Sequence, residues 1–243
     1  MLSFVVPAHN EEALIARTLK SIDQAAQTLF VSYEVVVADD SSADRTSEIA
    51  GEYGARVVAV NCRQISRARN AGAREARGDR FVFVDADTVI TGAVLQAAIK
   101  AMDKGAVGGG CSVEFDGQVP GYATVLLPPL TALYRLLGLA AGCFLFCTRP
   151  AFEKVGGFDQ RLFASEEIAM SRALKRQGRF VVLPESVTTS GRKLRTYTGR
   201  EVLRMLGNLV LSGPAYLRRR DGLDLWYGER REDPDLSPIE SSR

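Results

Sequence analysis

The feature that most constrains the fold is an alternation of short apolar runs with helix-period segments over about the first 90 residues. Buried strands are expected at 2–7, 34–38, 55–60 and 80–84, with helices in the intervals between them. Strands that alternate with helices in this way form βαβ units and build a parallel sheet. Ligands of such doubly wound sheets bind outside the carboxyl ends of the strands, so the chemistry is expected at that edge.

Cap and turn residues predict where the first helices begin and end. Asn10 is expected to cap the first helix. Asp44 is expected to cap the second, which would turn Tyr53 inward and end at Gly54 in the left-handed conformation. A third helix is expected across 64–77.

The second half of the chain is less regular. The Gly-rich passage 105–110 is assigned to neither helix nor strand. The elements expected around it are helices at 91–103, 165–177 with Ser165 as the N-cap, and 198–219, and strands at 142–148 and 179–183.

Composition excludes several classes of protein. Hydrophobic residues make up 46% of the 243, which is enough to fill a core, so the chain is expected to fold. Lys and Arg number 31 against 29 Asp and Glu, and the net charge of +2 gives no electrostatic basis for a nucleic-acid binder. The cysteines lack CxxC spacing and neighbouring histidines, so buried thiols are favoured over a zinc site or disulfides; they are Cys62, Cys111, Cys143 and Cys147.

Two segments bear on membranes. The first residues lack a basic region followed by an apolar stretch, so no signal peptide is expected and the chain is placed in the cytoplasm. The apolar stretch 122–147 is long enough to span a bilayer, but Pro128, Pro129 and Arg135 interrupt it, so a transmembrane helix is rejected. A helix that lies on a membrane surface or lines a pocket remains open, beside ordinary core packing.

The strongest chemical signal is Asp85-Ala86-Asp87, which directly follows the strand at 80–84. Residues two apart in an extended segment project to one face, so both carboxylates can bind one cation. Oxygen ligands of this kind suit Mg²⁺ or Mn²⁺, which keep positions open for phosphate oxygens. Because two uncompensated acids at the tip of a buried strand are costly, a metal site is favoured over a surface turn.

The loops after the first two strands lie at the same edge. Asp39 and Asp40 are adjacent carboxylates that can accept hydrogen bonds from a base or a ribose. The absence of a GxGxxG motif argues against a nicotinamide cofactor. The loop after the first strand could hold a nucleotide or form an ordinary turn, and it contains Pro7, Ala8, His9 and Glu11.

Three further groups have both a structural and a functional interpretation. Glu166 and Glu167 begin a helix, where the dipole stabilises acids, but one of them could also be a general base. Gly157 belongs to a tight turn, Gly156-Gly157-Phe158-Asp159, that could contact a ligand. Basic residues that could neutralise a diphosphate leaving group, or simply be solvated, are Arg67 and Arg69 with neighbouring Asn70, and Arg192, Lys193 and Arg195.

Five segments taken in order resemble glycosyltransferase family 2, whose enzymes have the GT-A fold: FVVPAHNEE, VVVADDSSADRT, ARNAGAREARGDRFVFVDADT, GGFD and SEE. The resemblance runs from residue 2 to about 195 and implies an α/β fold: a Rossmann-like, doubly wound, mainly parallel sheet flanked by helices, with a variable acceptor-side segment. It implies one domain over 1–228, with a nucleotide-binding half at 1–90 and an acceptor and catalytic half at 91–228. The polar segment 229–243 is expected to be a disordered tail.

The resemblance also implies a metal-dependent transfer of sugar from a nucleoside diphosphate-sugar to an acceptor hydroxyl, with inversion. Asp85 and Asp87 match the family's DxD motif, with Asp87 the more direct ligand of Mn²⁺ or Mg²⁺. The base corresponds by position to Glu167, but the family's Glu-Asp pair is here Glu166-Glu167, so both stay candidates. Residues expected around the donor are Pro7, Ala8, His9, Glu11, Asp39, Asp40, Arg69, Asn70, Asp85, Ala86, Gly157, Arg192 and Lys193.

The chain departs from the family near Thr188 to Ser190, where some relatives have a metal-ligating histidine. His9 is the only histidine here, so the metal is expected to have fewer protein ligands, with Arg192 or Lys193 sharing the phosphate charge. The apolar residues 120–140 fall on the acceptor side and predict a lipid-linked or apolar acceptor, with peripheral contact at the inner face of the membrane. A sugar nucleotidyltransferase and a non-catalytic nucleotide-sugar binder are the competing hypotheses.

Overall fold

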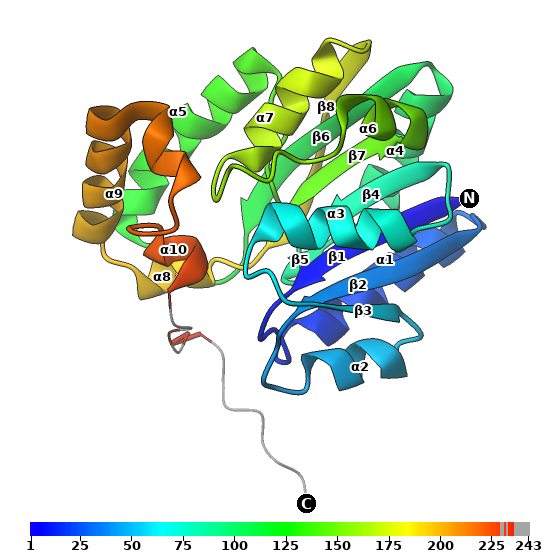
Figure 1. Ribbon diagram of the computed structural model, residues 1–243, viewed down its shortest axis with the longest axis horizontal. Coiled ribbons are helices and arrows are strands. Elements are labelled where there is room, and N and C mark those ends of the chain that lie inside the picture. The colour runs from blue at the N-terminus through cyan, green and yellow to red at the C-terminus, as the bar shows by residue number, and fades with distance from the viewer. Residues whose placement is uncertain (229–230, 232, 236–243) are drawn as a thin grey trace, which may run out of the picture.

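A computed structural model describes residues 1–228, 231 and 233–235 of the chain. Figure 1 shows a twisted sheet with helices on both faces. Within the described residues the sheet has eight strands in the order β3-β2-β1-β4-β7-β6-β8-β5. The strands are β1 Leu2–Ala8, β2 Tyr33–Asp40, β3 Arg56–Val60, β4 Arg80–Val84, β5 Thr88–Val89, β6 Ala106–Phe115, β7 Phe144–Thr148 and β8 Arg179–Thr189.

The helices pack on both faces of this sheet and extend beyond one end of it. Figure 1 shows α5, α9 and α10 gathered at the end of the molecule away from β2 and β3. The helices are α1 Ile15–Thr28, α2 Thr46–Glu52, α3 Ile65–Glu75, α4 Gly92–Asp103, α5 Gly121–Leu137, α6 Arg149–Val155, α7 Glu166–Lys175, α8 Arg192–Thr196, α9 Gly199–Ser212 and α10 Asp224–Tyr227, and Gly213–Arg218 form a 3-10 helix.

The first four strands confirm the predicted βαβ units. β1 pairs in parallel with β2 and β4, and β2 pairs in parallel with β3. Adjacent residues of one strand point to opposite faces: Val6 packs in the core formed with α1 and α4, whereas Val5 packs in the core formed with α3 and α7. Both faces of the sheet are therefore buried, which explains why these strands are continuous apolar runs.

The second half of the sheet is mixed. β7 lies between β4 and β6 and is antiparallel to both, β6 and β8 are parallel, and the two-residue β5 pairs antiparallel with β8. β8 is longer than the strand expected at 179–183, because its pairing with β6 resumes after a register shift that skips Pro184 and Glu185. This extension brings the end of β8 beside the residues that follow β4.

Residues 106–110 of the Gly-rich passage 105–110 belong to strand β6, which the sequence did not predict. A Cβ atom on Gly109 would lie 2.3 Å from the Val181 carbonyl oxygen and 2.4 Å from the Phe146 ring. One on Gly110 would lie 2.5 Å from the Ala140 Cβ atom. These glycines allow close packing around the strand, whereas glycine in a sequence more often indicates a turn.

Several predicted boundaries were wrong. Helix α1 begins at Ile15, and Asn10 adopts a φ of 52° and accepts a hydrogen bond from the Ala43 N–H, so Asn10 ties two loops together and does not cap the helix. Ser165 precedes α7 in the left-handed conformation and makes no side-chain cap. Tyr53 is 49% exposed and does not face inward.

The C-terminal elements also differ from prediction. The helix expected at 198–219 is interrupted, because α9 ends at Ser212 and a 3-10 helix follows from Gly213. Of the tail predicted at 229–243, residues 229–230, 232 and 236–243 lie outside the described residues. Among the residues that the structure describes, no helix is long and apolar enough to cross a membrane.

Candidate active site

The acidic residues after β4 lie where the ends of several strands meet. Asp85 donates its backbone N–H to the Cys143 carbonyl oxygen, before β7, at 3.2 Å. Asp87 accepts a backbone hydrogen bond from Ser190, just after β8, at 3.1 Å. The Asp85-Ala86-Asp87 segment is thereby connected to both halves of the sheet, at the edge where the sequence predicted the chemistry.

A buried arginine connects the first of these acids to helix α7. The guanidinium of Arg69, which is 1% exposed, donates at 2.7 Å to Asp85 Oδ1, to Glu166 Oε1 and to the Gly142 carbonyl oxygen. It also lies over the Phe158 ring, 5.2 Å from the ring centre. Arg69 was predicted to lie around the nucleotide-sugar or to be solvated; the structure buries it, and these partners make it an internal cross-link.

Asn70, next to Arg69, was also expected at the donor. Its side-chain amide donates to the Phe158 carbonyl oxygen at 2.8 Å and accepts from the Phe158 N–H at 2.9 Å. Gly157 has a φ of 78°, and a Cβ atom there would lie 2.6 Å from Asn70 Oδ1. Asn70 and Gly157 thus shape the tight turn before α7. For Gly157 such a turn was one of the two interpretations of the sequence, beside contact with a ligand.

The two glutamates at the start of α7 have different surroundings. Glu166 is 4% exposed and is held by Arg69. Burial raises the pKa of Glu166, although the Arg69 charge opposes that shift. Glu167 is half-buried, and burial together with the nearby charge of Glu166 raises the pKa of Glu167 to about 8. Glu167 therefore has the proton affinity that suits a general base near neutral pH.

Helix α5 passes beside these glutamates. Tyr134 of α5 is half-buried, and burial together with the charges of Glu167 and Glu166 raises its pKa. The sequence analysis gave Tyr134 no role, so this residue was missed. The one sequence feature that could have indicated it is an aromatic hydroxyl among the aliphatic residues of this segment, many of which the structure shows to be exposed.

Helix α8 brings cations to the second acid. Arg192 donates to both carboxylate oxygens of Glu11, at 3.0 and 3.1 Å, and its guanidinium nitrogen lies 3.9 Å from Asp87 Oδ2. Burial raises the pKa of Asp85, and the positive charges of Arg69 and Lys193 oppose that increase. The structure therefore brings Glu11, Asp87 and Arg192 together, with Lys193 close enough to act on Asp85.

The loops after β1, β2 and β3 are linked at the same edge. Asp40 accepts backbone hydrogen bonds from Cys62, Arg63 and Gln64 at 2.8 to 3.0 Å. Burial raises the pKa of Asp40, but these hydrogen bonds outweigh it and hold the pKa below its ordinary value. His9 Nδ1 lies 2.8 Å from the Asp40 carbonyl oxygen.

The other residues predicted around the nucleoside are also at this edge. Asp39 accepts hydrogen bonds from the hydroxyls of Ser42 and Ser47, the latter at 2.6 Å. Pro7 and Ala8 are the buried last residues of β1, and Ala86 is buried between the two acids. The nucleoside-binding role of these residues stays a prediction.

The donor atoms present fit a cation that takes part of its shell from a ligand. Within the described part of the chain, no group of three or more His, Cys, Asp or Glu residues could hold a metal by itself. Asp85 uses Oδ1 for Arg69, while the nearest cation to Asp87 among the described residues is Arg192, 3.9 Å away. Two carboxylates suit Mg²⁺ or Mn²⁺, which complete their shell with phosphate and water oxygens.

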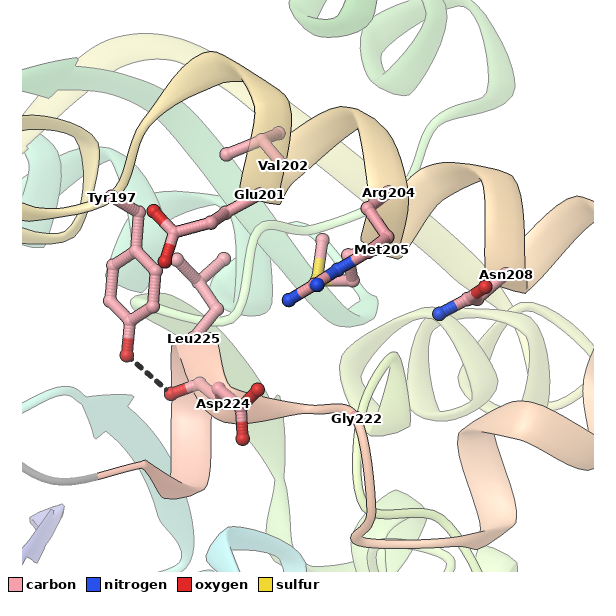
Figure 2. A pocket seen from close by; sticks show the side chains of 9 residues that line it. All are labelled: Tyr197, Glu201, Val202, Arg204, Met205, Asn208, Gly222, Asp224 and Leu225. Atoms are coloured by element: carbon pink, nitrogen blue, oxygen red, sulfur yellow. Dashed lines mark hydrogen bonds between the residues drawn. The ribbon is translucent and has the colours of Figure 1, made fainter.

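Two cavities lie away from the acids. One of about 320 Å³ lies between α9 and residues 222–225, where Figure 2 shows the Tyr197 hydroxyl pointing to Asp224. A second, of about 600 Å³, lies between β6 and α5. Its lining is mainly apolar: Val113, Phe115, Leu127, Pro128, Thr131, Ala132 and Arg135.

Residues 3–153 match the family model of Glycosyl transferase family 2, and the chain belongs to this family. The chain is 35% identical over 109 residues to a dolichol-phosphate mannosyltransferase from Pyrococcus furiosus, a match that covers 43% of this chain and 30% of the relative. It is 35% identical over 112 residues to an undecaprenyl-phosphate 4-deoxy-4-formamido-L-arabinose transferase from Edwardsiella ictaluri, covering 43% and 34%. The chain thus spans about a third of the length of these curated relatives.

Solved structures support the same fold. A mannosyltransferase from Pyrobaculum calidifontis, in complex with GDP-Man and Mn²⁺, has a TM-score of 0.63 at 20% identity, over 86% of this chain and 61% of that one. Glucosyl-3-phosphoglycerate synthase from Mycobacterium tuberculosis, in complex with Mn²⁺, UDP and glucosyl-3-phosphoglycerate, has a TM-score of 0.58 at 22% identity, over 91% of this chain and 81% of that one. The predicted GT-A fold is confirmed.

We expect the Arg69 cross-link to be a major contributor to stability. Arg69→Met leaves Asp85 and Glu166 without their shared cation and should lower the free energy of unfolding by about 3–5 kcal/mol, measured by urea denaturation. Adding Glu166→Gln should recover part of this loss, because it removes one of the two uncompensated charges.

Arg80→Met is the matched control for this cross-link. It breaks the Arg80–Asp103 ion pair, also 2.7 Å long but partly exposed, and should change the free energy of unfolding by about 1 kcal/mol or less. Equal losses in Arg69→Met and Arg80→Met would contradict the importance assigned to the cross-link.

Proposed function

We propose that this chain transfers a sugar from a nucleoside diphosphate-sugar to an acceptor hydroxyl, with inversion at the anomeric carbon and with Mn²⁺ or Mg²⁺. The observation that carries the proposal is the Arg69 cross-link, which connects Asp85 to the helix that bears Glu167. One buried side chain thereby relates the predicted diphosphate site to the predicted base. Family membership supports this assignment, as do the Mn²⁺ and nucleotides bound in the structures of similar proteins.

In this proposal Asp87 and Asp85 hold the metal ion. When bound, the metal would neutralise negative charge on the diphosphate and so favour its departure. Arg192 and Lys193 add positive charge from α8 on the same side. The donor's nucleoside would lie along the loops after β1 and β2, against His9 and the Asp39-Asp40 pair.

Glu167 is the base that we assign. Glu166 is paired with Arg69, whereas Glu167 forms no ion pair within the described residues and its raised pKa favours proton uptake. The carboxylate of Glu167 takes the proton of the acceptor hydroxyl while the acceptor oxygen bonds to the anomeric carbon and the bond from that carbon to the diphosphate breaks. Glu166 and Arg69 would then position α7 and take no proton themselves.

We further propose that the acceptor is lipid-linked or otherwise apolar and that the chain acts at the inner face of a membrane. Helix α5 exposes several large apolar side chains, with Leu136 at 84% and Val125 at 72%. The apolar groove between α5 and β6 has Arg135 in its lining, which suits a hydrocarbon chain next to an anionic group. Tyr134 of the same helix lies close enough to Glu167 to be affected by its charge, so an acceptor on α5 could reach the base.

Loss of the base should abolish turnover. With Mn²⁺ and a nucleotide-sugar, donor hydrolysis by the wild type should have a kcat/KM that rises with pH to a plateau above about 8, because Glu167 must be deprotonated. Glu167→Gln should lower the rate by about 10² to 10⁴-fold, and the control Glu153→Gln, an exposed glutamate of α6, should not. Equal turnover in Glu167→Gln and the wild type would refute this assignment.

The same variant has a stability signature that does not depend on activity. The folded-state pKa of Glu167 lies above its ordinary value of 4.5, so between about 4.5 and 8 the native state binds more protons than the unfolded state. Native stability due to this group is present at low pH and is lost as the pH rises through about 8. Glu167→Gln should therefore gain thermal stability relative to the wild type at pH 9 but not at pH 5.

The α5 surface should bind membranes. The wild type should float with anionic liposomes, and Leu136→Ser with Leu137→Ser should reduce the bound fraction severalfold, because both leucines are exposed on α5. The matched control is Phe30→Ser, an apolar residue that is 96% exposed between α1 and β2. Absence of flotation, with unchanged activity in the double variant, would refute the membrane part of the proposal.

A further inference from the structure

Described residues beyond α10 return to helix α8. We call Arg231 and residues 233–235 the C-terminal strap. The Asp233 carboxylate, whose side chain is 0% exposed, accepts hydrogen bonds from Arg195 Nε at 2.8 Å and from a terminal guanidinium nitrogen of Arg195 at 2.6 Å. This two-point pairing of a buried carboxylate with an arginine is the strong form of such contacts, and it determines orientation as well as distance.

The rest of the strap contacts the same region. Asp235 accepts the Gln118 N–H at 2.9 Å and lies 3.3 Å from Arg195 Nε. Arg231 donates to the Thr196 carbonyl oxygen at 2.8 Å, and its guanidinium lies 3.9 Å from the centre of the Tyr197 ring. The strap therefore contacts α8 through Arg231, Asp233 and Asp235. Arg231 also contacts Tyr197, the residue after α8, and Asp235 also contacts Gln118 in the turn beside it.

The turn after β6 completes this contact. Arg195 donates to the Asp116 carbonyl oxygen at 2.6 Å, and Asp116 Oδ1 accepts the Gly191 N–H at 2.9 Å. A Cβ atom on Gly117 would lie 2.5 Å from an Arg195 nitrogen and 2.6 Å from Asp235 Oδ2. The absence of a side chain at Gly117 lets the strap, Arg195 and the turn meet this closely.

Helix α8 depends on such contacts for its position. It has five residues, too few to be stable in isolation, so packing and side-chain contacts must hold it. On one side, Arg192 pairs with Glu11 and faces Asp87. On the other, Arg195 is held by Asp233. The cations assigned to the diphosphate thus lie on a short element clamped between the β1 loop and the strap.

We propose that Asp233, acting through Arg195, is a positioning residue that holds α8 with Arg192 and Lys193 at the donor diphosphate. The inference rests on the proposed function, since it needs a diphosphate beside α8. Without the Asp233 charge, Arg195 keeps Asp116 and Asp235 as partners, and α8 shifts toward them. The C-terminal strap is then part of the donor site and not a dispensable tail.

Asp233→Asn tests the proposal, because it removes the charge and retains the shape. Calorimetry with UDP or GDP and Mn²⁺ should show a Kd raised about tenfold, and kinetics should show a donor KM raised by about the same factor. The kcat at saturating donor and the KM for the acceptor should each change less than about twofold. Asp103→Asn is the control: it breaks the Arg80–Asp103 pair, and Arg80 begins β4 at the opposite end of that strand from Asp85. This control should bind donor like the wild type.

A second variant keeps the test decisive if Asp233→Asn folds poorly. Asp235→Asn changes a side chain that is 35% exposed, and it should also raise the donor Kd, by a smaller factor than Asp233→Asn does. Donor affinity equal to that of the wild type in both variants would overturn the inference. It would also be overturned if kcat and the affinity for the acceptor fell by as large a factor as the affinity for the donor. A wild type that binds none of the UDP-, GDP- and dTDP-sugars overturns the proposed function itself, so the two failures are distinguishable.

Discussion

The buried guanidinium of Arg69 is the interaction on which the rest of the site depends. It comes from α3 and joins Asp85, the Gly142 carbonyl oxygen and Glu166, which lies 97 residues further along the chain. Removing one partner of such a buried ionic group leaves an uncompensated charge in a low-dielectric interior. The residues after β4, the loop before β7 and the start of α7 must therefore keep one arrangement.

This arrangement explains why two adjacent glutamates can have different roles. Glu166 faces the arginine and is held by it, while Glu167 is next to a negative charge and partly removed from water. Burial and that neighbouring charge together raise the pKa of Glu167 to about 8. The same arginine thus holds Asp85 and Glu166 in place, while burial and the charge of Glu166 raise the pKa of Glu167 against the opposing charge of Arg69.

The parallel half of the fold was predictable because its strands are buried on both faces and read as unbroken apolar runs. Strand β6 was missed because its glycines serve close packing against Phe146 and Ala140, a requirement that only the folded neighbours reveal. The Asn10 cap failed because a distant contact with Ala43 holds Asn10 in a left-handed conformation. Local patterns thus predicted elements well where burial alone decides, and poorly where a tertiary contact decides.

The residues of the site also divide into those that the sequence predicted and those that it did not. Acids at strand ends were predictable, since the carboxyl edge of a parallel sheet collects them whatever follows. The inward direction of Arg69 and the return of Asp233 to Arg195 were not, because each depends on a partner far away in the sequence. From sequence alone, a basic residue near a predicted phosphate site indicates a ligand contact. Both Arg69 and Arg192 are buried, and only their partners distinguish them: Arg69 joins Asp85 to Glu166, whereas Arg192 pairs with Glu11 and lies 3.9 Å from Asp87.

The most direct measurement of the central claim is calorimetric titration of UDP-, GDP- and dTDP-sugars into the wild type and Asp87→Asn, each with and without Mn²⁺. If Asp87 holds a metal ion at the donor site, one class of donor should bind the wild type with Mn²⁺. Omission of Mn²⁺ should weaken this binding, and Asp87→Asn should lose its metal-dependent part. Donor binding that is unchanged by Mn²⁺ and by Asp87→Asn would contradict the assignment of this sheet edge as a metal-dependent nucleotide-sugar site.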